Sequence, residues 1–193
     1  MQKYGLKVAS PYEKKEETVI TGHGDIVLTE AGVYRIKCIG DTYVHHNVTS
    51  NMMHVTCESA KDDIEIHIKS NGQVNDGEVA DVYHSIIAKH KNVKTNIESR
   101  GVANGTGRII YRSSLGSLES SSGEGKQSGK FLILDNNAEV DAEPSLDIAS
   151  DTFPTTHAVS VSGIDNEKLF YMKSAGLSQK EAEDEIVSGF LNC

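Results

Sequence analysis

The sequence has little of several residue types that mark specialised protein classes. Its 193 residues include no Trp, 3 Pro and 3 Cys, and aromatic residues make up only 6% of the chain. The cysteines are far apart (Cys38, Cys57 and Cys193), so neither a disulfide framework nor a CxxC zinc site is predicted. No run of about 18 apolar residues occurs, and Met1–Tyr4 lead into polar sequence, so we expect neither a transmembrane helix nor a secretory signal. The simplest expectation is a protein of the reducing cytoplasm without a membrane partner.

Positive charge is also scarce. The chain has 19 Lys+Arg against 28 Asp+Glu, which gives a formal net charge of −9. Proteins that bind nucleic acid present basic patches that displace counterions from the phosphates. The charge balance therefore predicts no nucleic-acid partner.

Motifs of the common enzyme classes are missing as well. There is no GxSxG nucleophile elbow and no GxxxxGK[ST] phosphate loop, and the glycines at 101–107 do not precede a helical pattern. Carboxylate pairs such as Asp62-Asp63 are usually solvated where they stand in turns. A solenoid enzyme acting on carbohydrate would need an acid/base cluster that the sequence does not show. We expect no enzymatic activity.

From Thr18 to about Val161 the dominant hydrophobic period is two. Clear examples are Val33–Ile39, Ile64–Ile68 and Lys130–Leu134, and clusters of Asn, Asp and Gly separate such segments. Many short strands without intervening helices exclude a doubly wound α/β fold and leave a sandwich, a barrel or a β-solenoid. The Asn/Gly turns and the lack of two-residue hairpin signals favour the solenoid, but only slightly, because no fixed repeat is visible.

One stretch reads differently. Ser113–Gly129 is rich in Ser and Gly, a composition that predicts a mobile surface loop. The alternative is a loop that crosses the edge of the β-domain and becomes ordered on meeting a partner.

After Val161 the pattern becomes helical. Asp165 is placed to cap a helix over Asn166–Ala175 that ends at Gly176, and Ser178 with Glu181 forms a capping box for a second helix. The second helix carries an apolar stripe, made of Ala182, Ile186, Val187 and Phe190. The sequence thus predicts a β-domain over residues 1–162 and a C-terminal helical hairpin over residues 163–193.

The 8 histidines do not form a recognisable metal motif. His45 and His46 are adjacent, and adjacent side chains of a strand point to opposite faces, so they cannot both bind one metal without a bulge. His67 shares a strand face with Glu65, an arrangement that suits a metal pair but is commoner on a solvated face. Cys38 and Cys57 lie within predicted strands and are expected to be small core residues.

The C-terminal segment resembles a known family. Gly163–Ser178 reads GIDNEKLFYMKSAGLS and is followed by EAEDEIVSGF at Glu181–Phe190. Both are similar to the end of the SufB/SufD family, the scaffold subunits of the SUF machinery for iron–sulfur cluster assembly. Upstream, FLILDNNAEVDAEPSLDI at Phe131–Ile148 is similar to the strands that precede this end. The resemblance covers about Asp81–Leu191 and suggests a shortened member, because chains of this family are usually much longer.

The resemblance implies a mainly β fold, a right-handed parallel β-helix with a C-terminal helical region. It also implies a non-enzymatic scaffold that pairs with another β-helix, either a SufB-like subunit or a second copy in a homodimer. A transient iron–sulfur cluster would form at that junction, and a SufC-like ABC ATPase would dock on the helices. The apolar side chains available for docking are Leu169, Phe170, Ile186 and Phe190; packing within the chain is the alternative role for each.

His157 is the position that the resemblance carries over most directly as a metal ligand. The family has a His just before its GxID-type turn, and imidazole is a ligand of intermediate softness that can hold iron. Here Thr156 and Ala158 replace the flanking glutamates of the SufB type, and no Cys occurs between Cys57 and Cys193, so the chain is more SufD-like. Two alternatives stay open: His157 bonds only a turn carbonyl, or the whole chain is an interaction β-helix that has lost cluster chemistry.

Overall fold

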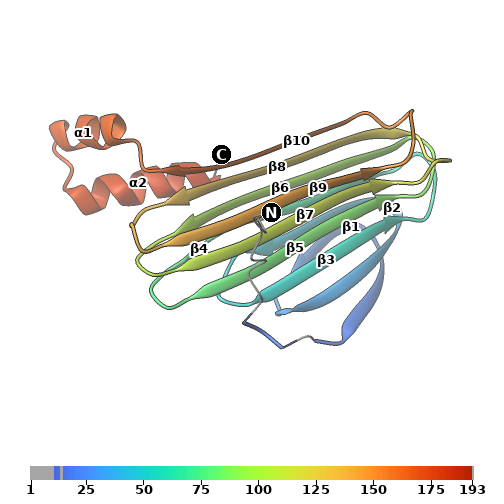
Figure 1. Ribbon diagram of the computed structural model, residues 1–193, viewed down its shortest axis with the longest axis horizontal. Helices are drawn as coiled ribbons and strands as arrows, with labels where there is room; N and C mark the ends of the chain where they lie inside the picture. The colour runs from blue at the N-terminus through green and yellow to red at the C-terminus, as the bar shows by residue number, and fades with distance from the viewer. Residues whose placement is uncertain (1–10, 14, 193) are drawn as a thin grey trace, which may run out of the picture.

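The chain folds into a parallel β-solenoid followed by two helices (Figure 1). The computed structural model describes residues 11–13 and 15–192. The strands are β1 (Glu17–Leu28), β2 (Gly32–Asn47), β3 (Met52–Ser59), β4 (Glu65–Val74), β5 (Val79–Ala88), β6 (Val93–Ala103), β7 (Arg108–Ser117), β8 (Gly123–Ile133), β9 (Glu139–Ile148) and β10 (Thr155–Gly163). The helices are α1 (Asn166–Ser174) and α2 (Gln179–Asn192). The expected β-helix with a C-terminal helical hairpin is confirmed.

The strands alternate between two faces of a flattened coil. Sheet A contains β4, β6, β8 and β10, and sheet B contains β3, β5, β7 and β9. The long strand β2 joins them, because Gly32–Cys38 pair with β3 whereas Thr42–Asn47 pair with β4. β1 covers both halves of β2. All these pairings are parallel, as expected when each strand stacks on the one a full turn earlier.

One turn of the solenoid, here called a coil, takes about 30 residues beyond β3. Ile68 pairs with Ile97, Ile97 with Gln127, and Gln127 with His157. No fixed repeat is visible in the sequence because stacked positions keep their inward direction but not their residue type. The period is a property of the backbone path, and the side chains in one row range from Ile to Gln to His.

Alternate side chains of every coil point into the interior, which we call the lumen. Its apolar part contains fully buried residues such as Ile36, Ile66, Ile86 and Leu115. Cys38 and Cys57 are also buried there as free thiols, as the sequence predicts. At about 25 cal/mol per Å² of apolar area, this burial is the main source of the fold's stability.

The predicted loop at Ser113–Gly129 is wrong. These residues form the end of β7, a short turn and most of β8, in the coil that precedes β9 and β10. The small residues are there because the lumen is crowded: a Cβ at Gly125 would come within 2.8 Å of the Leu115 side chain. The same crowding applies at Gly129, where a Cβ would lie 3.0 Å from Phe131. A composition typical of loops therefore serves close packing.

Polar ladders connect the turns of successive coils. The Asp76 carboxylate accepts from the Thr106 amide at 2.8 Å, and Asp135 accepts from the Gly105 amide at 3.1 Å. Gly105 has a φ of 60°, and a Cβ there would lie 1.9 Å from Asp76 Oδ1. Only glycine fits this turn without displacing the carboxylate.

The helical end follows the predicted caps. Asp165 accepts hydrogen bonds from the amides of Glu167 and Lys168, and α1 ends with Gly176 at a φ of 103°. The Leu177 amide donates back to the Met172 carbonyl, which completes a Schellman motif. Ser178 and Glu181 exchange the reciprocal hydrogen bonds of a capping box, at 2.8 and 3.3 Å.

Candidate functional site

The last coil leaves the solenoid open. Among the described residues, β10 pairs only with β8 and β9 pairs only with β7, so each has one free edge. We call this region, formed by β9 and β10, the open end. Inward-facing positions that are buried in earlier coils are exposed here, including Leu146 at 37% and Val161 at 43%. Free strand edges with apolar neighbours are prone to pair with another chain.

His157 lies on β10 at the open end. It is exposed and continues the row Val44, Ile68, Ile97 and Gln127, whose members point into the lumen. Within the described residues, no group of three or more His, Cys, Asp or Glu side chains is placed to hold a metal ion. Residues 11–13 and 15–192 therefore do not surround this imidazole with a complete set of metal ligands.

Behind the open end, the lumen contains an unexpected set of buried polar side chains. We call it the polar chain; its members are His46, Ser70, His84, Ser99, Tyr111, Ser113 and Gln127. His46 Nε2 lies 2.6 Å from His84 Nε2, and His84 Nδ1 lies 3.1 Å from Ser99 Oγ. Ser70 donates to Ser99 at 3.0 Å.

The hydrogen-bond partners assign the tautomers of both imidazoles. His46 Nδ1 lies 3.1 Å from the Asn47 carbonyl, which only accepts, so this nitrogen carries the proton. His46 Nε2 is then an acceptor, and His84 Nε2–H donates to it. His84 Nδ1 accepts in turn from Ser99. Both nitrogens of each ring have a hydrogen-bond partner in the neutral forms.

The pKa values agree with neutral imidazoles. Burial lowers the pKa of His46 to about 4, with a small opposing effect from the Asn47 carbonyl. Burial, followed by the proximity of His46, lowers the pKa of His84 well below its usual value. Burial also raises the pKa of Tyr111, whose neighbours are Ser113 and Ser99. The polar chain is therefore uncharged near neutral pH.

Gln127 ends the polar chain one coil before His157. Its Nε2 donates to the Ser113 carbonyl at 3.2 Å and to the Ser113 hydroxyl, and Ser145 donates to the same carbonyl at 3.1 Å. Gln127 is 2% exposed. The hydrogen bonds of the polar chain thus fall into two groups: His46, His84, Ser99 and Ser70 lie deeper in the lumen, whereas Ser113 and Gln127 lie directly beneath His157.

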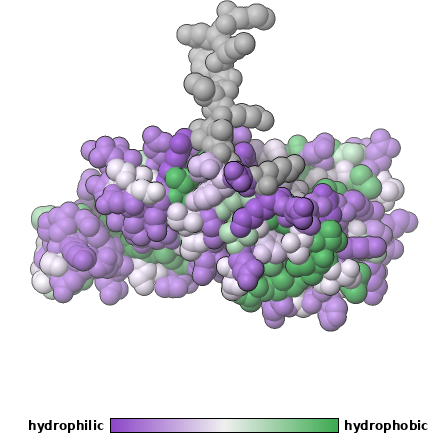
Figure 2. All heavy atoms as spheres, turned by 90° about the horizontal axis from the view of Figure 1, so that it is seen from below, coloured by the Kyte–Doolittle hydropathy of each residue, from purple (hydrophilic) through white to green (hydrophobic). Residues whose placement is uncertain are grey.

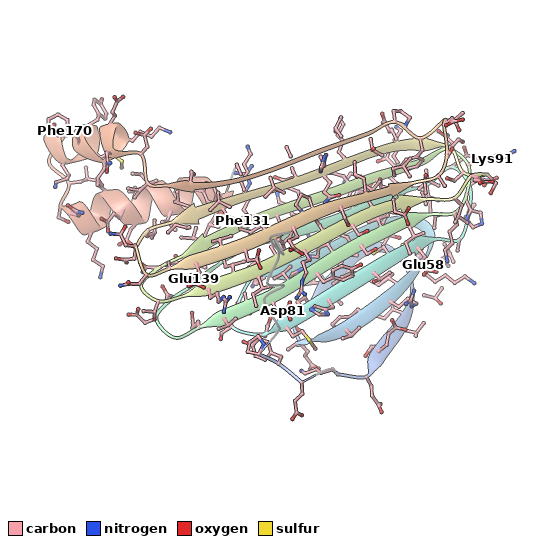
Figure 3. All side chains as sticks on the ribbon, viewed as in Figure 1. Glu58, Asp81, Lys91, Phe131, Glu139 and Phe170 are labelled. Carbon is pink, nitrogen blue, oxygen red and sulfur yellow. The ribbon has the colours of Figure 1, made fainter. Side chains whose placement is uncertain are left out.

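A second buried polar group lies on the outer face of sheet B. The Asp81 carboxylate is fully buried, 2.6 Å from Arg112 and 3.1 Å from His54. Figure 3 shows Asp81 far from the helical end that carries Phe170. Because the ion pair links β3, β5 and β7, we assign it to the stability of the sheet.

The helices attach to sheet A through the end of α2. Arg100 donates to the Phe190 carbonyl at 2.9 Å, and its guanidinium carbon lies 6.0 Å from the Phe190 ring centre. Asn71 donates to the Leu191 carbonyl at 3.1 Å. A cation and an amide therefore satisfy carbonyls at the negative end of the helix.

The four predicted docking residues lie in different environments. Leu169, Ile186 and Phe190 are half-buried, whereas Phe170 is 75% exposed, as is its neighbour Tyr171. Ile186 and Phe190 line a groove of about 670 Å³ between the helices and strands β8 and β10, together with Met172. Phe190 and Ile186 therefore pack partly within the chain. The Phe170 side chain instead faces mostly outward.

His45, His46, His67 and the buried cysteines Cys38 and Cys57 are placed as expected, whereas Cys193 lies outside the described residues. His46 points into the lumen, whereas His45 lies on the outer face. His67 Nε2 is 3.6 Å from Glu65 on the outer face of sheet A. The neighbouring Cys38 thiol, followed by burial, raises the pKa of the Cys57 thiol well above its usual value.

Three features of the interior and of sheet B were not predicted from the sequence: His84, Gln127 and the Asp81–Arg112 pair. A signal for His84 was present, because it has the same parity as Val82 and Ile86 in a strand of period two. A polar residue at an apolar position of such a strand indicates a buried hydrogen-bond partner. The partner itself lies 38 residues away in sequence, and no local pattern identifies it.

The far end of the solenoid, around β1, also exposes apolar side chains. Val19 and Val27 are 67% and 68% exposed. Figure 2, seen from below, shows hydrophobic residues gathered on that side of the molecule among hydrophilic ones. None of the helices in the described part of the chain is long and apolar enough to cross a membrane.

Comparison with known proteins gives a consistent result. Residues 28–190 match the family model described as the SufBD core domain of the SUF system for FeS cluster assembly. Iron–sulfur cluster assembly SufBD family proteins of Staphylococcus haemolyticus, Staphylococcus epidermidis and Staphylococcus aureus are each 32% identical over 116 residues. This alignment covers 60% of the chain and 25% of each relative, so the chain spans about a quarter of the length of these proteins.

Proposed function

The chain belongs to the SufBD family of iron–sulfur cluster assembly proteins, and from this premise we propose that it is a non-enzymatic scaffold subunit. In this proposal the open end pairs with a second β-solenoid, a cluster is held transiently at the junction, and an ABC-type ATPase docks on the helices. The observation that carries the proposal is the open end itself, which combines two free strand edges with an inward-pointing His157.

Pairing at the open end is supported by the unpaired strand edges and the exposed apolar side chains of that region. Free edges of β9 and β10 present backbone donors and acceptors, and the neighbouring Leu146 and Val161 are partly exposed. A second solenoid placed end to end would continue both sheets and cover these side chains. We propose a homodimer, with a SufB-like subunit as the other partner of the same surface.

His157 supplies one ligand of the cluster in this proposal. A neutral imidazole binds iron where thiolates are scarce, and the described residues bring no thiol to the open end. The remaining ligands would come from the partner chain or from small thiols. The cluster is cargo rather than a resident cofactor, so an incomplete ligand set suits its release.

Docking of the ATPase rests on the helices. Phe170 and Tyr171 form an exposed aromatic pair on α1, next to the groove lined by Met172, Ile186 and Phe190. Exposed aromatic residues beside an apolar groove are typical anchors of protein interfaces. The free thiols of Cys38 and Cys57 accord with a cytoplasmic location, where cysteines stay reduced.

A second candidate function is an interaction solenoid without cluster chemistry. It is favoured by the isolation of His157 from other metal ligands in the described part of the chain. The two candidates share the fold and the pairing surface, so they differ only in whether iron and sulfide are held.

Anaerobic reconstitution with iron and sulfide distinguishes them. Wild-type protein is compared with His157→Ala, and His45→Ala is the matched control because His45 lies on the outer face. We expect cluster absorption in wild type and the control, and its loss in His157→Ala. No absorption in any of them, alone or with a SufB-type partner, would favour the interaction solenoid.

A further inference from the structure

Gln127 has an orientation that its neighbours fix. Its amide nitrogen faces the Ser113 carbonyl at 3.2 Å and also donates to the Ser113 hydroxyl. A flipped amide would bring two acceptor oxygens together, so Nε2 must face Ser113 and Oε1 must point away from it.

Gln127 Oε1 is a buried acceptor without a hydrogen-bond partner among the described residues. Leaving such a group unpaired costs about 1–3 kcal/mol. A donor is therefore expected to reach it in the working assembly. Neither inward neighbour on β7 supplies that donor: the Tyr111 hydroxyl is likewise without a hydrogen-bond partner in this part of the chain, so it does not reach Oε1, and Ser113 is already bonded to the Gln127 nitrogen.

The coil beyond Gln127 offers one ring donor at the right position. His157 is the register partner of Gln127 in β10, and both occupy inward positions of adjacent strands. Parallel strands lie about 4.8 Å apart, a spacing at which an imidazole N–H on one strand can reach an amide oxygen on the next. His157 is exposed in the single chain, so its ring is free to turn toward Gln127 when the open end is covered.

We propose that Gln127 is the positioning residue of His157: its Oε1 accepts one ring N–H of His157 when a second subunit covers the open end. The other ring nitrogen is then unprotonated and can coordinate the bound iron. Metal-binding histidines almost always donate their second N–H to such an acceptor, which fixes both the tautomer and the ring orientation. The amide does this without adding charge to the site. This inference rests on the proposed function, because it assumes the covered open end.

The test reads the tautomer of His157 directly. The ¹⁵N shifts of the His157 ring are measured at neutral pH in the dimer of the wild-type protein and of Gln127→Leu. We expect one dominant tautomer in wild type and a mixture in Gln127→Leu. Ser113→Ala is the matched control, since it removes a partner of the Gln127 nitrogen but leaves Oε1 in place. Gln127→Met has nearly the same length and no acceptor oxygen, so it replaces Gln127→Leu if that variant does not fold, and it is expected to give the same mixture of tautomers.

Cluster loading gives the second measurement. At limiting iron we expect Gln127→Leu to reduce the cluster affinity about tenfold, within the usual range for loss of such a partner. An unchanged His157 tautomer in folded Gln127→Leu would overturn the inference, whatever happens to the cluster. If the tautomer follows Gln127 while His157→Ala still holds a cluster as well as wild type does, the pairing stands and the ligand role in the proposed function fails.

Discussion

Nε2 of His46 lies 2.6 Å from Nε2 of His84, so two imidazoles from different coils share one proton inside the lumen. Their outer nitrogens are fixed by the Asn47 carbonyl and the Ser99 hydroxyl. A further proton on His46 Nε2 would leave two N–H groups facing each other. Protonation of the pair in acid is therefore expected to lower the stability of the fold.

Stability should fall as the pH drops from about 6.5 to about 4. The unfolded chain takes up protons below the ordinary histidine pKa of about 6.5, whereas folded His46, with a pKa of about 4, does not. The contribution is complete above pH 6.5 and lost by about pH 4. At about 1.4 kcal/mol per pKa unit, His46 alone accounts for about 3 kcal/mol. Urea unfolding at several pH values measures this slope.

Two variants isolate the histidine pair from other acid effects. His46→Gln removes the titrating ring and should flatten the slope, although it lowers stability at neutral pH. His45→Gln changes the neighbouring, outward-facing residue and should keep the wild-type slope. Equal slopes in all three proteins would contradict the role of the buried pair.

The Asp81–Arg112 ion pair should matter far more than a surface pair. Asp81 is fully buried, so Asp81→Asn leaves Arg112 without its charge partner and should lower the free energy of unfolding by about 3 kcal/mol. Glu139→Gln removes the exposed partner of Arg108, 3.2 Å away, and should cost less than about 1 kcal/mol. Denaturant unfolding checks both, and similar losses would argue against a special role for burial.

The loss of stability on replacing a positive-φ glycine by alanine should depend on the atoms around that glycine. Gly105→Ala adds a Cβ at 1.9 Å from Asp76 Oδ1, so the turn ladder must move, and we expect a loss of about 2 kcal/mol or more. Gly24→Ala has a similar φ of 73° but nothing within 4 Å, and should cost only about 1 kcal/mol. Thermal unfolding of the two variants measures both stability losses. Equal losses would mean that backbone strain alone, without the contact to Asp76, determines the effect.

Replacing Phe170 and replacing Phe190 should have different effects on stability, although both should weaken ATPase docking. Phe170→Asp should abolish co-purification with the ATPase while leaving stability within about 0.5 kcal/mol, because the side chain is exposed. Phe190→Asp should lose both ATPase co-purification and stability, since Phe190 packs against Arg100. The control is Val27→Asp at the exposed β1 end, which should change neither ATPase co-purification nor stability. Normal ATPase binding by Phe170→Asp would remove α1 from the docking surface.

The local rules of the sequence predicted the local structure well. The period of two, the caps at Asp165 and Ser178 and the stop at Gly176 each depend on neighbours a few residues away, and each is confirmed. The error at Ser113–Gly129 came from composition, because small residues serve a crowded lumen as readily as a mobile loop.

The candidate site could be predicted only in part. His157 came from a resemblance, and its roles as iron ligand and partner contact stay predictions. Neither the orphaned oxygen of Gln127 nor the bond between His46 and His84 has a sequence signal, because the partners are brought together by stacking of coils about 30 residues apart.

The sequence by itself determined that the chain is a stack of short strands closed by a capped helical hairpin, since alternation and capping are local and depend on the nearest few residues. Only the tertiary structure decided which strands stack, which polar side chains meet in the lumen and that β9 and β10 each keep one free edge in the described part of the chain. Those outcomes depend on the number of residues in each coil, and that number is set by where the backbone can turn rather than by the type of any one residue.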